Sequence, residues 1–460
     1  MLTVELVKKA LQCSNDIPGV TEFTDVTTDS RTIAAGNLFV ALKGEKFDGH
    51  AFVKKALSEK AAAAVVDHVP EGVSAAQCFV VPDTLLAYQQ IARAYRLNFP
   101  KLKVIAITGS NGKTTTKDMI SAVLGERYRV VKTQANFNNE IGLPKTLLAI
   151  RPDTEIAVVE MGMRGMGQIR AMKAIALPDA AVITNVGESH LELLCSIENI
   201  AKAKSEILEN FTSVNHAFLN GDDPRVCHMQ TGATVHTYGI DSASDIKAVS
   251  MEGQGLQTEF AYVSRITGKM QTVQLPLLGR HNVMDALAAI AVGEVYGVPD
   301  EAIAHGLEHL HMTGMRQEIL QFGDITVIND AYNASPSSMK AGLEALHNVV
   351  QNKNKGRAIA VLADMLELGA KSRSGHEAVG KWTSQYGVAE LICYGPESVY
   401  MAQAAEKAGV AVHYCTDQME AARTLAKCLQ PGDTVLLKGS HAMGVDQLVT
   451  MVFTDKEAAK

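Results

Sequence analysis

The sequence predicts an α/β protein of three domains, and three observations carry this prediction. The chain has 460 residues, about three times the usual size of one domain. Apolar, β-branched runs alternate with helical patterns along most of the chain, which is typical of doubly wound, mainly parallel sheets. Residues 104–124 run from such a strand through two glycines into a helix, and this unit marks the central domain.

Residues 1–100 are expected to form the first domain, a smaller one of mixed α/β structure. A helix over 85–97 ends near Asn98-Phe99-Pro100, so we place the domain boundary there. The other elements expected here are a helix over 2–11 and short buried strands at 38–42 and 62–66.

Residues 101–312 should form the central domain around a mainly parallel sheet. A strand pair at 256–263 and 270–277 is expected at one side, followed by an alanine-rich helix over 282–296. The remaining strands are expected from 104 and at 128–132, 156–160 and 180–185, with helices at 114–124, 167–175 and 197–209.

The strand–helix pattern restarts near residue 313, so 313–460 should form a C-terminal, Rossmann-like α/β unit. This unit lacks a G-x-G-x-x-G fingerprint, so the sequence does not support a dinucleotide site. Its strands are expected at 325–329, 358–363, 390–394 and 434–438.

Composition argues against several classes of protein. The net charge is −7 and no run is rich in lysine or arginine, so nothing favours nucleic acid as a partner. The seven cysteines are scattered, without a C-x-x-C pair, which indicates free thiols in a reducing compartment. The first ten residues carry charges through their apolar pattern, and no stretch approaches about 18 uncharged apolar residues. We therefore expect a cytoplasmic protein without membrane insertion.

The loop between the central strand and its helix has the composition of a phosphate-binding loop. It departs from G-x-x-x-x-G-K-[ST], because only two residues separate its glycines. Small residues let backbone N–H groups turn towards a phosphate, and the helix N-terminus adds its positive end. The alternative, a glycine-rich turn with a surface lysine, explains less of the pattern. The loop residues are Gly109, Ser110, Asn111, Gly112, Lys113, Thr114 and Thr115.

Glu160 and His190 follow central strands, where ligands bind in open parallel sheets. Glu160 is a candidate Mg²⁺ ligand, against the alternative of a charged residue that opens a turn. A lone histidine is more often structural, so His190 does not by itself establish a metal or phosphate contact. Lys204 lies on a helix among glutamates, and by itself this pattern favours ion pairing on a solvated face.

An amide-rich segment follows the strand expected at 128–132. Asparagine binds ligands through paired donor and acceptor groups, but it also caps turns. Three asparagines within four residues favour a ligand-binding segment. The candidate residues are Thr133, Asn136, Asn138 and Asn139.

Asp330 and Arg316 each allow two interpretations. Asp330 stands at a strand end and could hold a ribose hydroxyl, or it could cap the helix that starts near Pro336. Ser335 is the better candidate for that cap. Arg316 lies in a domain-boundary loop, where it could reach a phosphate or be an exposed hinge residue, and the sequence alone does not decide.

Together these motifs resemble those of the ATP-dependent Mur ligases, and the resemblance spans nearly the whole chain. In the first domain, Asp29-Ser30-Arg31 and residues 44–50 are similar to the family's UDP-sugar domain. In the other two domains the matching segments are 108–115, 160–162, 185–192, 279–282 and 330–333. Residues 136–144, 330–336 and 364–369 resemble the family members that act on D-alanyl-D-alanine.

The resemblance implies an ATP-dependent amide ligase of peptidoglycan precursor synthesis. Such an enzyme adds D-alanyl-D-alanine to UDP-N-acetylmuramoyl-tripeptide through an acyl phosphate, and it releases ADP and phosphate. The first domain would bind the UDP-sugar peptide, the second ATP, and the third D-alanyl-D-alanine while closing over ATP. We expect a monomer that uses two Mg²⁺ ions.

The resemblance also implies roles for single residues. Lys113 would act on the β- and γ-phosphates, and Lys204 matches a lysine that family members carbamylate, which reverses its ordinary interpretation. The metal ligands would be Thr114, Glu160, His190 and carbamylated Lys204. The ATP contacts would include Asn282 at adenine, Arg316 at the phosphates and Asp330 at the ribose. The UDP-peptide contacts would be Asp29, Ser30, Arg31, Lys43, His50, Thr133, Asn136, Asn138 and Asn139.

Three positions depart from the family pattern. Ala363 stands where glycine is expected before Asp364, and Cys195 stands where glycine is usual after His190. Both are expected to change loop geometry. His441 stands where arginine is common, which leaves the contacts to D-alanyl-D-alanine open.

Rival interpretations are a Mur ligase that adds diaminopimelate or lysine, a folylpolyglutamate synthetase, and a P-loop switch that uses nucleotide only for signalling. The Asp-Asn-Pro-Arg motif of the diaminopimelate type is absent from the sequence. A folate enzyme would not need the sugar domain, and a switch would not need the amide-rich segment.

Overall fold

The computed structural model describes residues 1–44, 47–187, 191–254, 256–312, 314–353 and 355–453. The chain folds into two compact units. The first comprises Met1–Ala106, Tyr128–Met163 and Gly167–Ala180; the second comprises Ile107–Arg127, Arg164–Met166 and Ala181–Lys460. The mixed α/β class with mainly parallel sheets is confirmed, whereas the three-domain division stays a prediction. Within the described residues, no helix combines the length and apolar character that a membrane-crossing segment needs.

The first unit begins with a small parallel sheet in the order β3-β4-β5-β6. Its apolar residues, among them Phe39, Val53 and Val66, form one buried core with α2. The strands are β3 (Val26–Thr27), β4 (Leu38–Val40), β5 (Ala63–Val66) and β6 (Cys78–Val80), beside the antiparallel pair β1 (Leu2–Thr3) and β2 (Glu22–Phe23). The helices are α1 (Val4–Leu11), α2 (Val53–Glu59) and α3 (Thr84–Leu97).

The rest of the first unit holds two parallel strands with polar residues at their carboxyl ends. Thr133 follows β8 (Val130–Lys132), and Glu160 ends β9 (Ile156–Glu160). The accompanying helices are α5 (Gly142–Leu148) and α6 (Gln168–Ala176), within one residue of prediction for α6. This arrangement brings the two polar residues to one edge.

The strand order β15-β14-β13-β12-β11-β10-β7 lies mainly in the second unit, although Lys103–Ala106 of β7 and Ala180 of β10 belong to the first. Strands β7 (Lys103–Thr108), β10 (Ala180–Ile183), β11 (His216–Asn220) and β12 (Thr234–Gly239) precede an antiparallel extension of β13 (Ile246–Gln254), β14 (Gln257–Ser264) and β15 (Met270–Leu275). The helices are α4 (Lys113–Gly125), α7 (Leu191–Leu194), α8 (Ile197–Ser205), α9 (Pro224–Cys227), α10 (Arg280–Val295) and α11 (Asp300–Glu308).

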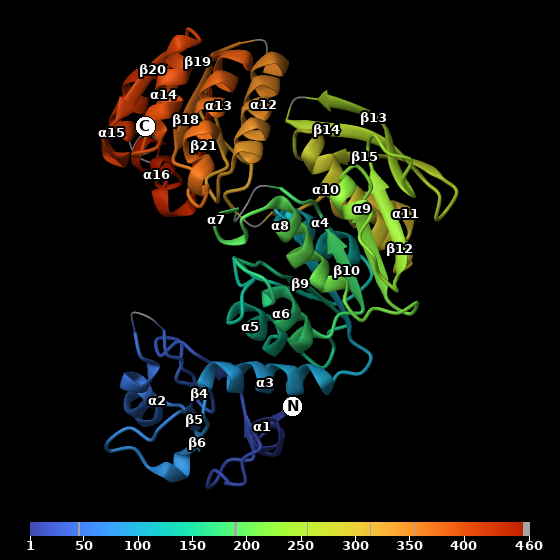
Figure 1. Ribbon diagram of the computed structural model, residues 1–460, viewed down its shortest axis with the longest axis vertical. Coiled ribbons are helices and arrows are strands. Elements are labelled where there is room, and N and C mark those ends of the chain that lie inside the picture. Colours follow the sequence, from blue (N-terminus) through green and yellow to red (C-terminus); the bar gives the residue numbers. More distant parts are fainter. Residues whose placement is uncertain (45–46, 188–190, 255, 313, 354, 454–460) are drawn as a thin grey trace. The chain divides into compact units, whose positions relative to one another are not determined.

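The C-terminal sheet of the second unit has the order β16-β17-β21-β18-β19-β20 and is parallel except at β16. Alternate residues of β18 enter two cores: Ala360 packs with α12 and α13, whereas Val361 packs with α15 and α16. Helices therefore cover both faces, as Figure 1 shows, which is the doubly wound arrangement. The strands are β16 (Glu318–Phe322), β17 (Ile325–Asn329), β18 (Ala358–Ala363), β19 (Val388–Tyr394), β20 (Ala411–Cys415) and β21 (Thr434–Lys438). The helices are α12 (Pro336–Lys353), α13 (Ser372–Gln385), α14 (Ser398–Lys407), α15 (Gln418–Cys428) and α16 (Gln447–Phe453).

Candidate active site

The predicted phosphate loop joins β7 to α4 and needs glycine at both of its glycine positions. A Cβ atom on Gly109 would lie 1.8 Å from the Thr184 hydroxyl oxygen, and one on Gly112 would lie 2.6 Å from Asp285 Oδ1. Gly112 also has a φ of +80°, which L residues rarely adopt. The loop backbone therefore packs against its neighbours more closely than any side chain would allow.

The two residues after β10 hold the loop in place. The Thr184 hydroxyl donates to the carbonyl of Asn111 over 2.6 Å, and Asn185 Oδ1 accepts from the Asn111 amide over 3.0 Å. The Ser110 amide donates to the carbonyl of Asn185. These bonds fix the loop before any nucleotide binds, so little ordering entropy remains to be lost on binding.

Lys113 and Lys204 are electrostatic neighbours. The ammonium group of Lys113 donates to the carbonyls of Gly109 and Ser110, over 2.8 and 3.2 Å. Lys204 is 1% exposed, and its burial, together with the charge of Lys113, holds its pKa well below the usual value. The solvated ion-pairing face that the helix pattern favoured for Lys204 is therefore wrong. A neutral amine is the nucleophilic form that could react with carbon dioxide.

Asp285 lies under the loop on α10, and sequence reasoning missed it. Its Oδ1 accepts from the Thr116 hydroxyl over 2.8 Å, and burial raises its pKa to about 7. A signal was present, because Asp285 directly precedes the uncharged, alanine-rich run of residues 286–293. Carboxylates in such helices rarely occur without a partner.

Asn282 belongs to a hydrogen-bond network centred on Gln317. The Asn282 amide donates to Gln317 Oε1 and to the carbonyl of Leu278, each over 2.8 Å. Gln317 Nε2 contacts His281 Nε2 over 3.0 Å. The network uses the N–H groups of the Asn282 side chain, so its Oδ1 is the atom left to accept a hydrogen bond from a ligand.

Arg316 lies between two residues in the left-handed region, Met315 with φ 63° and Gln317 with φ 49°. Its guanidinium carbon lies 3.8 Å from the ring centre of Tyr332, and its buried Nε has no hydrogen-bond partner among the described residues. The Tyr332 ring in turn lies 5.8 Å from the His441 ring. Arg316 is thus held by stacking, which leaves hydrogen-bond donors for an anion.

Asp330 does not cap α12, so that alternative is wrong. Its Oδ2 pairs with Lys438 over 2.6 Å, and its Oδ1 accepts from the Gln317 amide over 3.3 Å. The Ser335 hydroxyl accepts from the Ser338 amide at the start of α12, as predicted. The side chain of Asn111 also reaches this helix start, where it accepts from Ser335 and donates to Ser337.

In the first unit, Thr133, Asn138 and Glu160 form one cluster. The Glu160 amide donates to the Thr133 hydroxyl over 3.0 Å, and Asn138 Nδ2 donates to Glu160 Oε1 over 2.8 Å. Glu160 is 1% exposed. Asn136 is exposed, and Asn139 Oδ1 accepts from the amides of Ile141 and Gly142 in the turn before α5, so a turn contact accounts for one of the three asparagines.

The predicted sugar-domain residues include a preformed ion pair. Asp29 accepts from the Arg31 backbone and guanidinium, and this pairing lowers the pKa of Asp29 to about 2. Ser30 between them is half-buried, and Lys43 is exposed.

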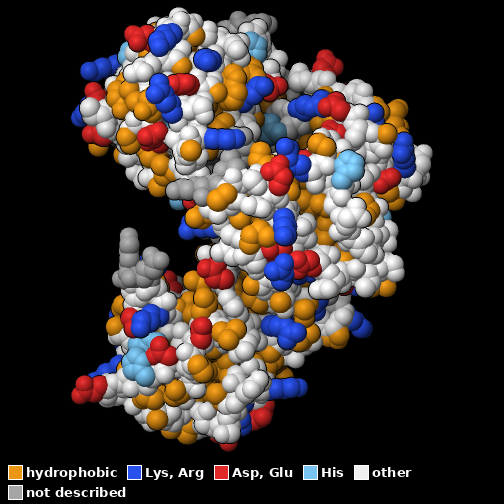
Figure 2. All heavy atoms as spheres, in the orientation of Figure 1, with side chains coloured by type: hydrophobic (Ala, Val, Ile, Leu, Met, Phe, Trp, Pro, Cys, Tyr) orange, Lys and Arg blue, Asp and Glu red, His pale blue; other side chains and the backbone are white. Residues whose placement is uncertain are grey.

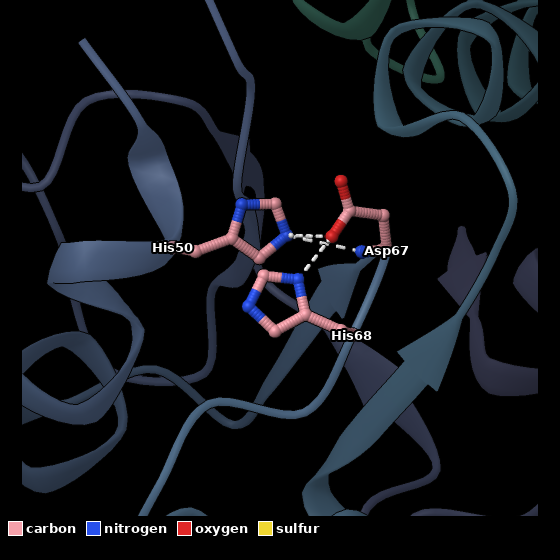
Figure 3. Close-up of side chains that lie close together, drawn as sticks. All are labelled: His50, Asp67 and His68. Carbon is pink, nitrogen blue, oxygen red and sulfur yellow. Dashed lines mark hydrogen bonds and ion pairs between the residues drawn. The ribbon is translucent and has the colours of Figure 1, made fainter.

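His50 is 5% exposed, and both ring nitrogens are engaged; Figure 3 shows the contact with Asp67. Nδ1 contacts Asp48 Oδ1 over 2.6 Å, and Nε2 accepts from the Asp67 amide over 3.0 Å. These bonds favour a structural role for the ring, and its contact with substrate stays a prediction.

His190 lies outside the described residues, so its predicted metal contact has no structural account. The structure describes both positions at which this chain has another residue in place of the family's glycine. Cys195 has φ 64°, the conformation that favours glycine. The Ala363 Cβ lies 2.9 Å from where a Cβ on Gly439 would stand, so the glycine at 439 makes room for the alanine.

The fold and the loop define the class, a P-loop nucleotide-binding enzyme with a second Rossmann-like unit. Three family models match the chain: the Mur ligase family catalytic domain over residues 22–96, the middle domain over 107–293, and the glutamate ligase domain over 315–441. The chain belongs to the Mur ligase family.

Relatives narrow the comparison within that family. The chain is 42% identical to the UDP-N-acetylmuramoyl-tripeptide–D-alanyl-D-alanine ligase of Bacillus subtilis, over 92% of both chains. A crystal structure of MurF from Acinetobacter baumannii has a TM-score of 0.89 at 30% identity and covers 98% of this chain and 99% of that one. MurF from Thermotoga maritima, solved in complex with ADP, has a TM-score of 0.82 at 27% identity, with 95% and 98% covered.

Proposed function

We propose that this protein is an ATP-dependent peptide ligase that joins D-alanyl-D-alanine to UDP-N-acetylmuramoyl-tripeptide. The products are the UDP-linked pentapeptide, ADP and phosphate. The observation that carries the proposal is the 42% identity to a ligase of this name over 92% of both chains, with the P-loop intact. We place the reaction in the cytoplasm and expect a monomer to perform it.

The reaction needs an activated carboxylate. A peptide carboxylate is a poor electrophile, so its oxygen first attacks the γ-phosphorus of ATP. The bond to the β-phosphate oxygen breaks, ADP leaves, and an acyl phosphate forms. The neutral amine of D-alanyl-D-alanine then attacks the acyl carbon, phosphate leaves, and the amine loses a proton as the amide forms. Two anions must approach in the first step, so preorganised positive charge lowers its barrier.

Lys113 and the loop would supply that charge. Bound phosphate would replace the loop carbonyls as the partner of the Lys113 ammonium group, which already lies 2.8 Å from one of them. The loop residues Gly109 to Thr115 would donate backbone N–H groups at the start of α4, where the helix dipole favours negative charge.

The proposed magnesium ligands are Thr114, Glu160, His190 and carbamylated Lys204. The buried carboxylate of Glu160 and the hydroxyl of Thr114 are oxygen donors of the kind that Mg²⁺ prefers. The depressed pKa of Lys204 fits a lysine that is neutral and able to form a carbamate. Mg²⁺ would neutralise charge on the transferred phosphoryl group.

For the nucleotide, we propose Asn282 at adenine, Arg316 at the phosphates and Asp330 at the ribose. Gln317 supports this, because it bonds to both Asn282 and Asp330 and directly follows Arg316 in the chain, so the base, ribose and phosphate contacts are placed together. The UDP-peptide would contact Asp29, Ser30, Arg31, Lys43, His50, Thr133, Asn136, Asn138 and Asn139. The three family models support a division into sugar, ATP and amino-acid domains.

Phosphate release tests the function. The assay contains ATP, UDP-N-acetylmuramoyl-tripeptide and D-alanyl-D-alanine, and each is omitted in turn. Full turnover should require all three, and mass spectrometry should find the pentapeptide. Release that persists without both acceptors would instead support a nucleotide switch, and turnover with diaminopimelate in place of the dipeptide would support a different family member.

A further inference from the structure

Three side chains with metal-binding atoms converge in the C-terminal sheet, away from every residue of the candidate active site. Glu390 lies on β19, His413 on the neighbouring strand β20, and Cys428 ends α15. Glu390 pairs with Ala411 in a parallel ladder, so the cluster lies towards the amino ends of the strands. Asp330 and Lys438 lie at the carboxyl ends of β17 and β21. The cluster is therefore outside the nucleotide site.

The spacing of these atoms fits one tetrahedral ion. His413 Nε2 lies 3.2 Å from Glu390 Oε2 and 3.7 Å from Cys428 Sγ, and all three ligand atoms lie within 4.8 Å of one another. Zinc bonds of about 2.0–2.1 Å to nitrogen or oxygen and about 2.3 Å to sulfur give tetrahedral edges of about 3.4 and 3.6 Å. The two observed contacts match these edges without movement of the backbone.

The carboxylate is oriented by a second layer of contacts. Arg357 binds Glu390 through Nη1 and binds Asp433 over 2.8 Å. Asp433, which is 1% exposed, balances the arginine charge, so Glu390 and a Cys428 thiolate would present two negative charges to a cation. Hydrogen-bonded carboxylates of this kind support metal ligands in many sites.

The other histidine cluster, His50, Asp67 and His68, fails the same geometric test. Its imidazole rings are stacked, with centroids 4.6 Å apart and planes 14° from parallel, as Figure 3 shows. A metal ion binds in the plane of an imidazole, and two parallel planes do not meet at one ion. His50 Nε2 also accepts from the Asp67 amide.

We propose that Glu390, His413 and Cys428 bind a divalent transition-metal ion of the zinc class, with water as the fourth ligand. The side chain of His413 is 40% exposed, which gives the ion and the water access. On binding, the thiol loses its proton to solvent and a sulfur–metal bond forms, while the neutral imidazole binds through Nε2 and carries its proton on Nδ1. The ion would tie the edge strand β20 and the end of α15 to β19.

Without the ion, the surroundings of Cys428 favour its neutral thiol over the thiolate. Burial and the neighbouring Glu390 raise the pKa of Cys428 to about 11. Binding must therefore release about one proton per ion near neutral pH, and affinity should rise with pH.

Cobalt titration of the metal-free full-length protein tests the proposal. The wild type should bind one Co²⁺ with a thiolate-to-cobalt charge-transfer band and intense visible bands of tetrahedral coordination. Cys428→Ser should abolish the charge-transfer band, and His413→Ala should weaken binding at least tenfold. Cobalt in the magnesium site has only oxygen and nitrogen ligands, so it would not produce that band.

Cys415→Ser is the matched control, because Cys415 is a neighbouring thiol that contacts Thr424 instead. It should keep both bands. Absence of a charge-transfer band in the folded wild type, checked by circular dichroism, overturns the proposal, and so does a band that persists in Cys428→Ser. Since the wild-type spectrum alone decides the first point, misfolding of a variant does not obscure it.

Discussion

The ammonium group of Lys438 lies 2.6 Å from Asp330 Oδ2, and the pair joins the ends of β17 and β21. Asp330 is also the proposed ribose contact. The same ammonium group donates to the carbonyl of Asn333 over 3.1 Å. The lysine side chain is 3% exposed and the aspartate 15%. The pair therefore orients a carboxylate that is proposed to meet substrate.

Lys438→Met should lower the free energy of unfolding by about 3 kcal/mol, because it leaves the half-buried carboxylate of Asp330 without its partner. Calorimetric unfolding measures the loss. The double variant Lys438→Met with Asp330→Asn should recover much of it. Lys381→Met, at an exposed lysine on α13, is the control and should change little; an equal loss there would contradict the buried-pair explanation.

Lys113→Ala should lower kcat by about 10²–10³-fold, because one positive group facing the transferred phosphoryl is lost. Binding of the UDP-peptide, measured by calorimetric titration, should stay within about twofold. Lys103→Ala removes a lysine from the exposed start of β7 and should keep full turnover. Survival of turnover in Lys113→Ala would contradict the proposed role of the loop.

Gln317→Ala should raise KM for ATP about tenfold, because it removes the side chain that holds Asn282 and His281; one lost hydrogen bond of about 1.4 kcal/mol corresponds to that factor. KM for D-alanyl-D-alanine should change little. Gln321→Ala, at an exposed position on the adjoining strand β16, serves as the control. A larger rise in KM for ATP in the Gln321 variant than in the Gln317 variant would show that ATP binding depends on strand β16 and not on the Gln317 network.

The pH dependence of stability should reveal Asp285. Its pKa is raised to about 7 in the folded protein from an ordinary value of 3.8, so the folded state binds the proton more tightly. The protonated group favours folding below about pH 4, and this advantage is lost as the pH rises to about 7. The change amounts to about 4 kcal/mol at most.

Asp285→Asn keeps an oxygen that can accept from Thr116 but has no proton to lose. Its melting temperature should therefore fall less than that of the wild type between about pH 4 and about pH 7, the window given by the raised pKa of Asp285. Parallel melting profiles for the two proteins would show that Asp285 does not titrate in this range.

Lys204→Met should abolish turnover while leaving stability equal or higher, because it replaces a buried amine with an apolar chain of similar length. With ¹³C-labelled bicarbonate, the wild type should show one carbamate carbon resonance by NMR that the variant lacks. A fully active Lys204→Met would remove the residue from the proposed metal site.

The sequence predicted buried apolar strands better than polar ones. Strands β9, β17, β18 and β21 begin and end where expected, because each is a mainly apolar run whose residues are almost all buried. Strands β11, β12, β13, β16 and β20 were missed, and so were the short strands β1, β2, β3 and β6. β12, Thr-Val-His-Thr-Tyr-Gly, is polar for a strand, and its place in the sheet depends on neighbours far along the chain.

The residues of the candidate site also fall into those that the sequence predicts and those that it does not. The phosphate loop could be predicted, because its chemistry is written in consecutive residues. Gln317 could not, since its importance comes from contacts with His281 and Asn282, which lie 36 and 35 positions away. Lys204 was misjudged without the resemblance, because burial decides its charge and local helical spacing does not reveal burial.

The surface visible in Figure 2 carries lysine, arginine, aspartate and glutamate side chains intermixed. No extended patch of one sign covers that face. That face therefore offers no broad field of one sign to attract a ligand. In the candidate active site, recognition depends instead on single placed groups such as Arg316.

Met315 and Gln317 give that arginine an unusual support. Each holds a left-handed conformation that costs an L residue about 1–2 kcal/mol. Glycine at either position would remove this cost, but it would also admit many other chain directions in the unfolded and partly open ensembles. The less favourable backbone conformation of this segment therefore fixes the direction of one guanidinium group. A glycine variant should be more stable, but it should be a less accurate enzyme because that group would be held less precisely.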